Sequence, residues 1–329
     1  MRIRTHDQRS RGGADGTAAR TRGSTLGPPD VRSFPRVAPV SVHVASHVRL
    51  HGVQTGWVAI KRAHVRLPRP AALRLPAIMA DPRWAAPKPI LSWVIEHPDG
   101  LILVDAGERA QANDLHAYTR GADPGTRAFI THNFRIYVHP DDELGATLRR
   151  LGYTVRDIRA VVQTHLHFDH AGGLVHVPHA PVLVGPAELA GRRAAPVGAL
   201  RARWPRNFAP QPVTYTGRAL PGFPHSAALT PAGDVAVVPT PGHSDGHQSV
   251  IVFGSDRAYL LGGNVTFDER QVRRRELAGI VQNVAVSRQS VDAVRRFVSA
   301  QPTVYLPSHD PEALARLAAQ QVTTLELSA

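Results

Sequence analysis

Cysteine is absent from this sequence of 329 residues, so neither a disulfide nor a thiolate metal site can form. Any metal ion must therefore be held by histidine and carboxylate side chains. Lysine is almost as scarce, because only Lys61 and Lys88 occur among 39 basic residues. No apolar run approaches the roughly 18 residues that a membrane-spanning helix needs. We therefore expect a protein with no membrane partner.

The first 36 residues have little apolar character, and they lack the apolar stretch of roughly 7 to 15 residues found in secretory signals. They contain eight arginines and three aspartates, which is +5 of the net charge of +13. Such a segment cannot bury enough surface to offset the entropy of ordering. We predict a disordered basic tail over residues 1–36, a single domain over residues 37–329, and a cytoplasmic protein.

The excess of positive charge raises the question of a nucleic-acid partner. No run of basic residues alternates with aromatic residues, and the densest cluster is Arg273, Arg274 and Arg275. A solvated helix face or loop accounts for this triplet better than a nucleic-acid patch does. We therefore predict no nucleic-acid partner.

Strand and helix patterns alternate along the rest of the chain. Two apolar runs flank a Pro-Asp-Gly turn at residues 97–100, which predicts a hairpin. Periodicity and capping residues predict helices from an N-cap at Asp141 to a stop at Gly152, over 290–300 and over 311–321. Strands are predicted at 91–96, 101–105, 158–163, 182–184, 235–238, 249–253, 258–261 and 303–306. The pattern is that of a mixed α/β domain.

Histidine is concentrated in one segment, residues 164–173, which reads THLHFDHAGG and follows an apolar strand. In an extended chain His165, His167 and Asp169 project to one side, and a turn into a helix brings His170 to a neighbouring point. Imidazole and carboxylate are donors that Zn²⁺ accepts, so the spacing favours two adjacent metal sites. Chance clustering among 18 histidines is the alternative.

Two later segments repeat the arrangement of a histidine just past a strand. One is TPGHSDGH at 240–247, which contains His243 and His247, and the other is LPSHD at 306–310, which contains His309. We interpret His247 as supporting the site rather than binding metal. Surface or structural roles are expected for eleven others: His43, His47, His51, His64, His97, His116, His132, His139, His176, His179 and His225.

Together these motifs resemble the metallo-β-lactamase superfamily over about residues 45–322, and most closely its N-acyl homoserine lactonase branch. The resemblance implies a four-layer αββα sandwich of two mixed β-sheets and two divalent metal ions, zinc by analogy. It also implies a small-molecule substrate, a quorum-quenching role and, as in many members, a homodimer. The metal ligands that it implies are His165, His167 and His243 for the first ion, and Asp169, His170 and His309 for the second. Asp105 matches an aspartate that supports the site without binding metal.

The sequence departs from the family pattern at two positions. Asn264 stands where the family has an aspartate that bridges both metals, and a neutral amide offsets no charge between two cations. The second metal site is therefore expected to be weak or empty, and Asp268 is a distant alternative ligand. Phe267 stands where lactonases often carry a substrate-binding tyrosine, so we expect it to line an apolar part of the substrate pocket.

The expected reaction is the opening of a lactone ring by a metal-bound hydroxide, with Asp169 orienting the nucleophile and passing a proton to the leaving alkoxide. Hydrolysis of aryl esters or phosphotriesters on the same metals is the main alternative. A glyoxalase II activity and nucleic-acid processing are less consistent with the sequence. A metal-binding protein impaired by Asn264 is the alternative outside catalysis.

Overall fold

The computed structural model describes residues 30–68, 70–190 and 198–326. Most of the predicted tail, residues 1–29, lies outside the described residues. Residues 30–36 are described and contact the domain: the ring of Phe34 lies 4.9 Å from that of Trp57, and Arg36 pairs with Asp142 at 3.0 Å. The packed part of the chain thus includes residues before 37.

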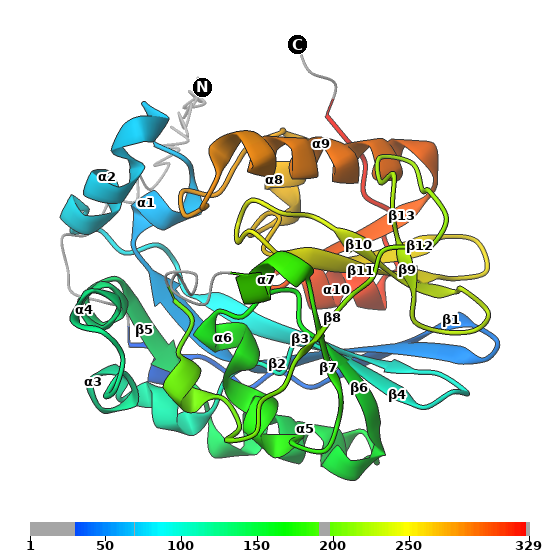
Figure 1. Ribbon diagram of the computed structural model, residues 1–329, viewed down its shortest axis with the longest axis horizontal. Helices are drawn as coiled ribbons and strands as arrows, with labels where there is room; N and C mark the ends of the chain where they lie inside the picture. The colour runs from blue at the N-terminus through cyan, green and yellow to red at the C-terminus, as the bar shows by residue number, and fades with distance from the viewer. Residues whose placement is uncertain (1–29, 69, 191–197, 327–329) are drawn as a thin grey trace, which may run out of the picture.

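Two mixed β-sheets form the centre of the fold (Figure 1). The first has the order β1-β2-β3-β4-β6-β7-β8 with β5 beside β2, and the second has the order β13-β12-β11-β10-β9. The strands of the first are β1 Val40–Ala45, β2 Val48–Ile60, β3 Lys88–Glu96, β4 Leu101–Val104, β5 Phe134–Tyr137, β6 Ile158–Val162, β7 Val182–Val184 and β8 Gln211–Pro212. Those of the second are β9 Ala227–Ala228, β10 Val235–Pro239, β11 Gln248–Phe253, β12 Ala258–Gly263 and β13 Thr303–Pro307.

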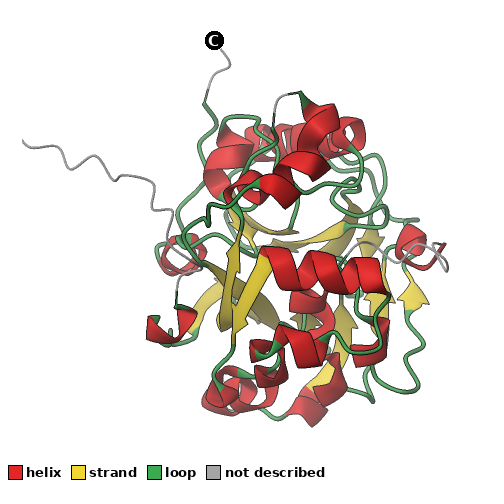
Figure 2. Cartoon of the chain, turned by 90° about the vertical axis from the view of Figure 1, so that its left-hand side faces the viewer, coloured by secondary structure: helices red, strands yellow, loops and turns green. Residues whose placement is uncertain are grey.

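Helices lie on both sides of the strands (Figure 2). The α-helices are α1 Arg62–Val65, α2 Arg74–Ala80, α3 Leu115–Tyr118, α4 Pro124–Asn133, α5 Leu144–Arg150, α6 Phe168–Ala171, α7 Pro186–Ala190, α8 Glu269–Arg273, α9 Val284–Ala300 and α10 Ala313–Ala318. Short 3-10 turns are η1 Val31–Ser33, η2 Ala71–Leu73, η3 Ala110–Asn113, η4 Pro140–Asp142, η5 Val155–Asp157, η6 Gly172–His176 and η7 Arg201–Arg203. None of the described helices is long and apolar enough to cross a membrane.

Alternation along β12 shows how the layers are built. Tyr259 and Leu261 point into a core between the sheets, where they meet Trp93 of the first sheet. Leu260 points to the opposite face and packs with Phe297 of α9. A second outer core lies between the first sheet and helix α5. Each sheet is therefore buried on both faces, as the predicted αββα sandwich requires.

Most predicted elements are present, with shifted ends. The predicted hairpin is β3–β4, which pair antiparallel. Helix α9 begins at Val284 instead of residue 290, because the Asn283 side chain caps it by accepting from the Val286 amide at 3.1 Å. Helix α10 spans only 313–318 of the predicted 311–321.

The prediction that Asp141 caps a helix is wrong. Asp141 lies in the 3-10 turn η4, and helix α5 starts at Leu144 with Glu143 at its N-cap position. The His139 side chain accepts from the Asp141 amide at 3.2 Å, which forms this earlier turn. The predicted stop is confirmed, because Gly152 follows the helix with a φ of +87°.

Truncation of the inter-sheet core tests this packing. Leu261 is completely buried, so Leu261→Ala is expected to lower the free energy of unfolding by about 2–5 kcal/mol. Leu73→Ala, at a leucine that is 55% exposed, is the matched control and should change it by less than about 0.5 kcal/mol. Urea denaturation followed by circular dichroism measures both, and equal effects would contradict the assigned packing.

Candidate metal centre

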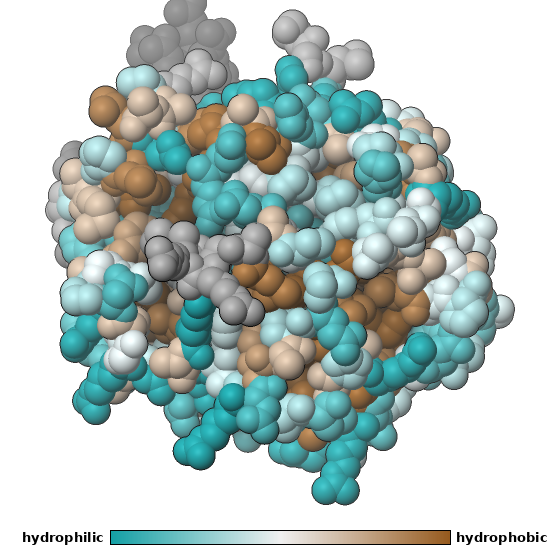
Figure 3. Space-filling view, in the orientation of Figure 1, coloured by the Kyte–Doolittle hydropathy of each residue, from teal (hydrophilic) through white to brown (hydrophobic). Residues whose placement is uncertain are grey.

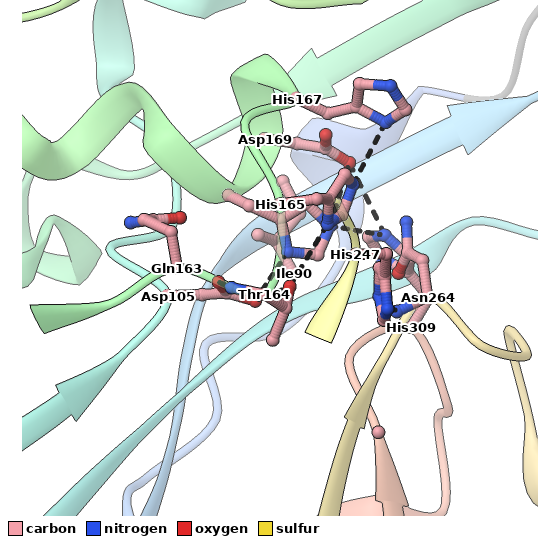
Figure 4. A network of polar contacts seen from close by, with 12 residues as sticks. Ile90, Asp105, Gln163, Thr164, His165, His167, Asp169, His247, Asn264 and His309 are labelled. Carbon is pink, nitrogen blue, oxygen red and sulfur yellow. Dashed lines mark hydrogen bonds and ion pairs between the residues drawn. The ribbon is translucent and has the colours of Figure 1, made fainter. Parts of the chain in front are cut away.

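Five strand ends meet at one edge of the sandwich and carry the polar side chains that the sequence singled out. Asp105 follows β4, residues 163–170 follow β6, His243 lies past the end of β10, Asn264 follows β12 and His309 follows β13. Figure 4 shows His165, Asp169, Asn264 and His309 close to one another at this edge. Ligand sites of α/β folds lie at such carboxyl ends of strands.

One group contains three imidazoles, those of His165, His167 and His243. The Nδ1 atom of His167 lies 3.0 Å from His165 Nε2 and 3.1 Å from His243 Nε2. Burial and the neighbouring imidazoles lower the pKa of His165 and of His243 well below its usual value, and that of His167 to about 3. The rings are therefore neutral at pH 7 and present lone pairs to a common point.

A second group contains Asp169, His170 and His309. Asp169 Oδ2 lies 3.4 Å from His309 Nε2 and 4.0 Å from His170 Nε2, and the two Nε2 atoms are 3.3 Å apart. All three side chains are buried. The six residues that the sequence analysis assigned to two metals are thus brought together in the two groups that it expected. Metal binding by them remains a prediction.

The outer nitrogen of several rings is held by a hydrogen bond. His309 Nδ1 donates to the Pro89 carbonyl at 2.8 Å, and His243 Nδ1 donates to the Ile280 carbonyl at 3.0 Å. These bonds place the proton on Nδ1 and leave Nε2 free to act as a ligand. The donor chemistry therefore fits a divalent cation in each group.

Asp105 supports His170 and belongs to neither group. Its Oδ2 accepts from His170 Nδ1 at 2.7 Å, and both of its oxygens accept from Thr164, at 2.7 and 2.8 Å. Burial lowers the pKa of His170, but the Asp105 and Asp169 carboxylates outweigh it and raise the pKa overall. Asp105 leaves the strand with a φ of +58°, which turns its carboxylate into the site.

Asn264 lies beside the first group. Its Nδ2 donates to His243 Nε2 at 3.3 Å, and its Oδ1 is buried without a hydrogen-bond partner among the residues that the structure describes. An unpaired buried amide oxygen is costly, and a cation would satisfy it. The backbone N–H of Asn264 donates to His247 Nε2 at 2.9 Å. His247 therefore fixes the backbone at this position, which is the supporting role that the sequence analysis gave it.

Asp268 does not replace the missing carboxylate. Its side chain caps helix α8 by accepting from the Gln271 amide at 3.1 Å, and its other oxygen lies 3.8 Å from Lys88 Nζ. These contacts hold it away from both groups. The end of β12 therefore brings one neutral side chain, Asn264, to the centre.

A pocket with a mainly apolar lining opens beside the two groups. Phe267 is buried in its wall, with ring centroids 5.5 Å from His309 and 6.3 Å from His243. His167, Asp169, His243, Asn264 and His309 form its polar end, and the remaining lining is Val58, Ile60, His64, Phe134, Phe168, Gly198, Phe267 and Ile280. The position predicted for Phe267 is thus beside the site, and substrate contact by its ring remains a prediction.

Sequence reasoning missed two buried groups close to the site. His64 lines the pocket from α1, and within the described part of the chain its two ring nitrogens have no hydrogen-bond partner. Glu108 lies after β4, accepts from the Tyr118 hydroxyl at 2.8 Å, and has its pKa raised to about 8 by burial. Neither residue belongs to a motif. Glu108 had one weak signal, its place directly after the strand-end Asp105-Ala106-Gly107.

The model of the metallo-beta-lactamase superfamily matches residues 85–309. The chain belongs to this superfamily. A protein described as a probable metallo-hydrolase of Mycobacterium tuberculosis is 33% identical over 180 residues, which is 53% of this chain and 56% of that protein. The match therefore spans little more than half of that relative's length. The superfamily expected from the sequence is confirmed.

Other similarities are to N-acyl homoserine lactonases. An N-acyl homoserine lactonase of Bacillus thuringiensis subsp. kurstaki is 27% identical over 235 residues, covering 68% of this chain and 82% of the lactonase. A solved N-acyl homoserine lactone hydrolase with the product N-hexanoyl-L-homoserine at its metal centre has a TM-score of 0.63 at 18% identity, covering 82% and 95% of the two chains. The latter similarity supports the fold alone.

Restoring a carboxylate at the end of β12 tests the role of Asn264. Asn264→Asp adds a negative charge beside the buried groups, so we expect it to bind the second metal equivalent at least tenfold more tightly. Metal content after dialysis against graded zinc concentrations, measured by mass spectrometry, gives the two affinities. Asn207→Asp, at an exposed asparagine in a turn, is the control. Equal zinc binding by all three proteins would contradict the prediction.

Buried His64 makes a separate prediction about acid stability. Burial lowers its pKa from 6.5 to about 4, and Asn133 and Asp81 offset only part of this effect. Below pH 6.5 the unfolded chain binds a proton that the folded chain does not. The free energy of unfolding therefore decreases as the pH is lowered from 6.5 to about 4. His64→Leu removes this loss, which amounts to about 3 kcal/mol.

Urea denaturation of the wild type and of His64→Leu at pH 7.5, 6, 5 and 4 measures the effect. The stability of the variant relative to the wild type should grow as the pH falls through this range. His132→Leu, at an exposed histidine, is the control and should run parallel to the wild type. A pH-independent difference for His64→Leu would contradict the buried neutral ring.

Proposed function

We propose that this protein is a metallo-hydrolase that opens the lactone ring of N-acyl homoserine lactones, with two zinc ions held by the two groups of the metal centre. The observation that carries the proposal is the position of both groups at the polar end of an apolar pocket. The Bacillus lactonase supports it, because the similarity spans 82% of that enzyme. Zinc is the proposed metal because imidazole dominates both donor sets.

His165, His167 and His243 would hold one divalent cation and Asp169, His170 and His309 the other, and such ions would supply Lewis-acid chemistry that acidifies an attacking water and polarises the substrate carbonyl. The chain's own residues would orient the attacking water and transfer its proton. Asp169 is the carboxylate that faces the pocket, so it orients the attacking water and receives its proton. When the ring C–O bond breaks, Asp169 passes that proton to the alkoxide. The product is a single hydroxy acid.

The apolar lining suits the acyl chain of the substrate. A shallow hollow lined by Leu75, Phe129 and Val281 shares His167, His243 and Ile280 with the pocket, so an apolar path leads outward past α2. Figure 3 shows apolar residues gathered on the surface where Figure 1 places α1 and α2. Burying each CH₂ group of a chain there would contribute about 0.8 kcal/mol.

Phe267 supports a second candidate, the hydrolysis of aryl esters or phosphotriesters. Its ring lies against His309 and His243 and has no hydroxyl to donate to a lactone carbonyl. The metals would then supply all of the oxyanion stabilisation, and the aromatic wall favours an aryl leaving group.

A homodimer is proposed from family resemblance alone.

Acid release in weakly buffered solution with zinc tests the proposal. Homoserine lactones of several chain lengths, an aryl ester and a phosphotriester serve as substrates. We expect release that a chelator abolishes, that is fastest with lactones and that increases with acyl length. Asp169→Asn should lower kcat at least about 100-fold, because it removes the proton-transfer group. Asp256→Asn, the same change at an exposed turn, should leave kcat unchanged.

The outcomes distinguish the candidates. Turnover of the aryl ester or phosphotriester without the lactones would replace the proposal by the second candidate. If the wild type hydrolyses none of the substrates and Asn264→Asp hydrolyses at least one, the metal centre is impaired at its bridging position. If neither the wild type nor Asn264→Asp hydrolyses any of the substrates at full zinc content, the hydrolase proposal is overturned.

A further inference from the structure

A second cluster of metal-ligating side chains lies at the opposite edge of the sandwich. His47 is in the turn between β1 and β2, His97 follows β3, and Asp234 directly precedes β10. Strands β4 and β10 run from this edge to Asp105 and to the His243 loop, so the whole length of the sheets separates the cluster from the candidate metal centre. In Figure 1 the turns after β1 and between β3 and β4 lie on the right-hand side.

We propose that His47, His97 and Asp234 form a structural zinc site that fastens the two sheets together. The turns that carry the histidines belong to the first sheet, and Asp234 belongs to the second. A cation bound by all three residues would therefore cross-link both layers. This proposal is independent of the reaction that the protein catalyses.

The geometry of the cluster matches that of a zinc site. Asp234 Oδ2 lies 2.9 Å from His47 Nε2 and 3.2 Å from His97 Nε2, and the three ligand atoms lie within 4.8 Å of one another. Tetrahedral zinc with bonds of about 2.0–2.1 Å separates its ligand atoms by about 3.3 Å. The candidate metal centre has the same spacing, because His167 Nδ1 lies 3.0 and 3.1 Å from its two neighbours.

The surroundings prepare the ligands for a cation. His97 Nδ1 accepts from the Asp99 backbone N–H at 3.1 Å, which fixes the orientation of the ring and keeps Nε2 directed toward Asp234. The Thr230 hydroxyl donates to Asp234 Oδ1 at 2.5 Å and leaves Oδ2 facing the histidines.

The burial of the three side chains also suits a structural ion, because one side of the cluster remains open to a water ligand. The His97 and Asp234 side chains are 4% and 16% exposed, whereas that of His47 is 48% exposed. Two ligands are thus fixed in the fold, and the third closes over the ion from the solvent side. Two imidazoles and one carboxylate favour zinc over the harder cations Ca²⁺ and Mg²⁺, which prefer oxygen.

Zinc binding by variants of the full chain tests the proposal. His47→Gln removes one ligand at an exposed turn, and Asp234→Asn removes the shared oxygen. His43→Gln, an exposed histidine of β1, is the matched control. Equilibrium dialysis with zinc should show one equivalent fewer bound by His47→Gln and by Asp234→Asn than by the wild type and His43→Gln.

Thermal unfolding separates the zinc site from a hydrogen-bonded cluster. Ligands that bind only the folded state raise its stability, so zinc should raise the Tm of the wild type and of His43→Gln more than that of the two ligand variants. In excess chelator, His47→Gln should unfold at the Tm of His43→Gln. Equal zinc binding and equal zinc-dependent shifts in all four proteins would overturn the proposal. A Tm loss in chelator without any loss of bound zinc would do the same and indicate a hydrogen-bonded cluster alone.

Discussion

Burial of histidine and aspartate side chains at one edge of the sandwich is the constraint on which the rest of the structure depends. A desolvated imidazole or carboxylate is stable only when its polar atoms have partners. The partners here are Pro89 near the start of β3 for His309, Asp105 just after β4 for His170, and Ile280 between α8 and α9 for His243. The same bonds that satisfy the outer atoms aim the inner ones at a common point. Local stability and ligand geometry therefore have the same physical origin.

Much of this arrangement could be predicted from the sequence, because strands that are buried on both faces appear as short apolar runs. Strand β2 was not predicted, and its composition explains why. It is buried along most of its length although it contains His51, Gly52 and Gln54. Leu314 and Trp93 pack so closely over Gly52 that a Cβ there would lie 2.5 Å from the leucine. This glycine reflects a contact with helix α10, which no local pattern reveals.

At the site, too, some residues could be predicted from the sequence and others could not. The ligand groups could be predicted because residues 165–170 are close in sequence and because His243 and His309 each follow an apolar strand. His64 and Glu108 could not, since their importance comes from burial against Phe134 and Tyr118, which are distant in sequence. Asn264 is the instructive case. The sequence identified it as a departure, and the structure adds that its amide oxygen is buried and unpaired beside His243.

The separation of the two ligand groups along the chain sets an order for their assembly during synthesis. All members of the first group lie at or before residue 243, whereas the second group needs His309, which follows β13. Strand β13 pairs in parallel with β12, so His309 reaches the edge only after the helix α9 crossover has folded over the second sheet. A nascent chain on the ribosome can thus complete the first group while the second still lacks a ligand. Co-translational folding would then bring the first group together before the second.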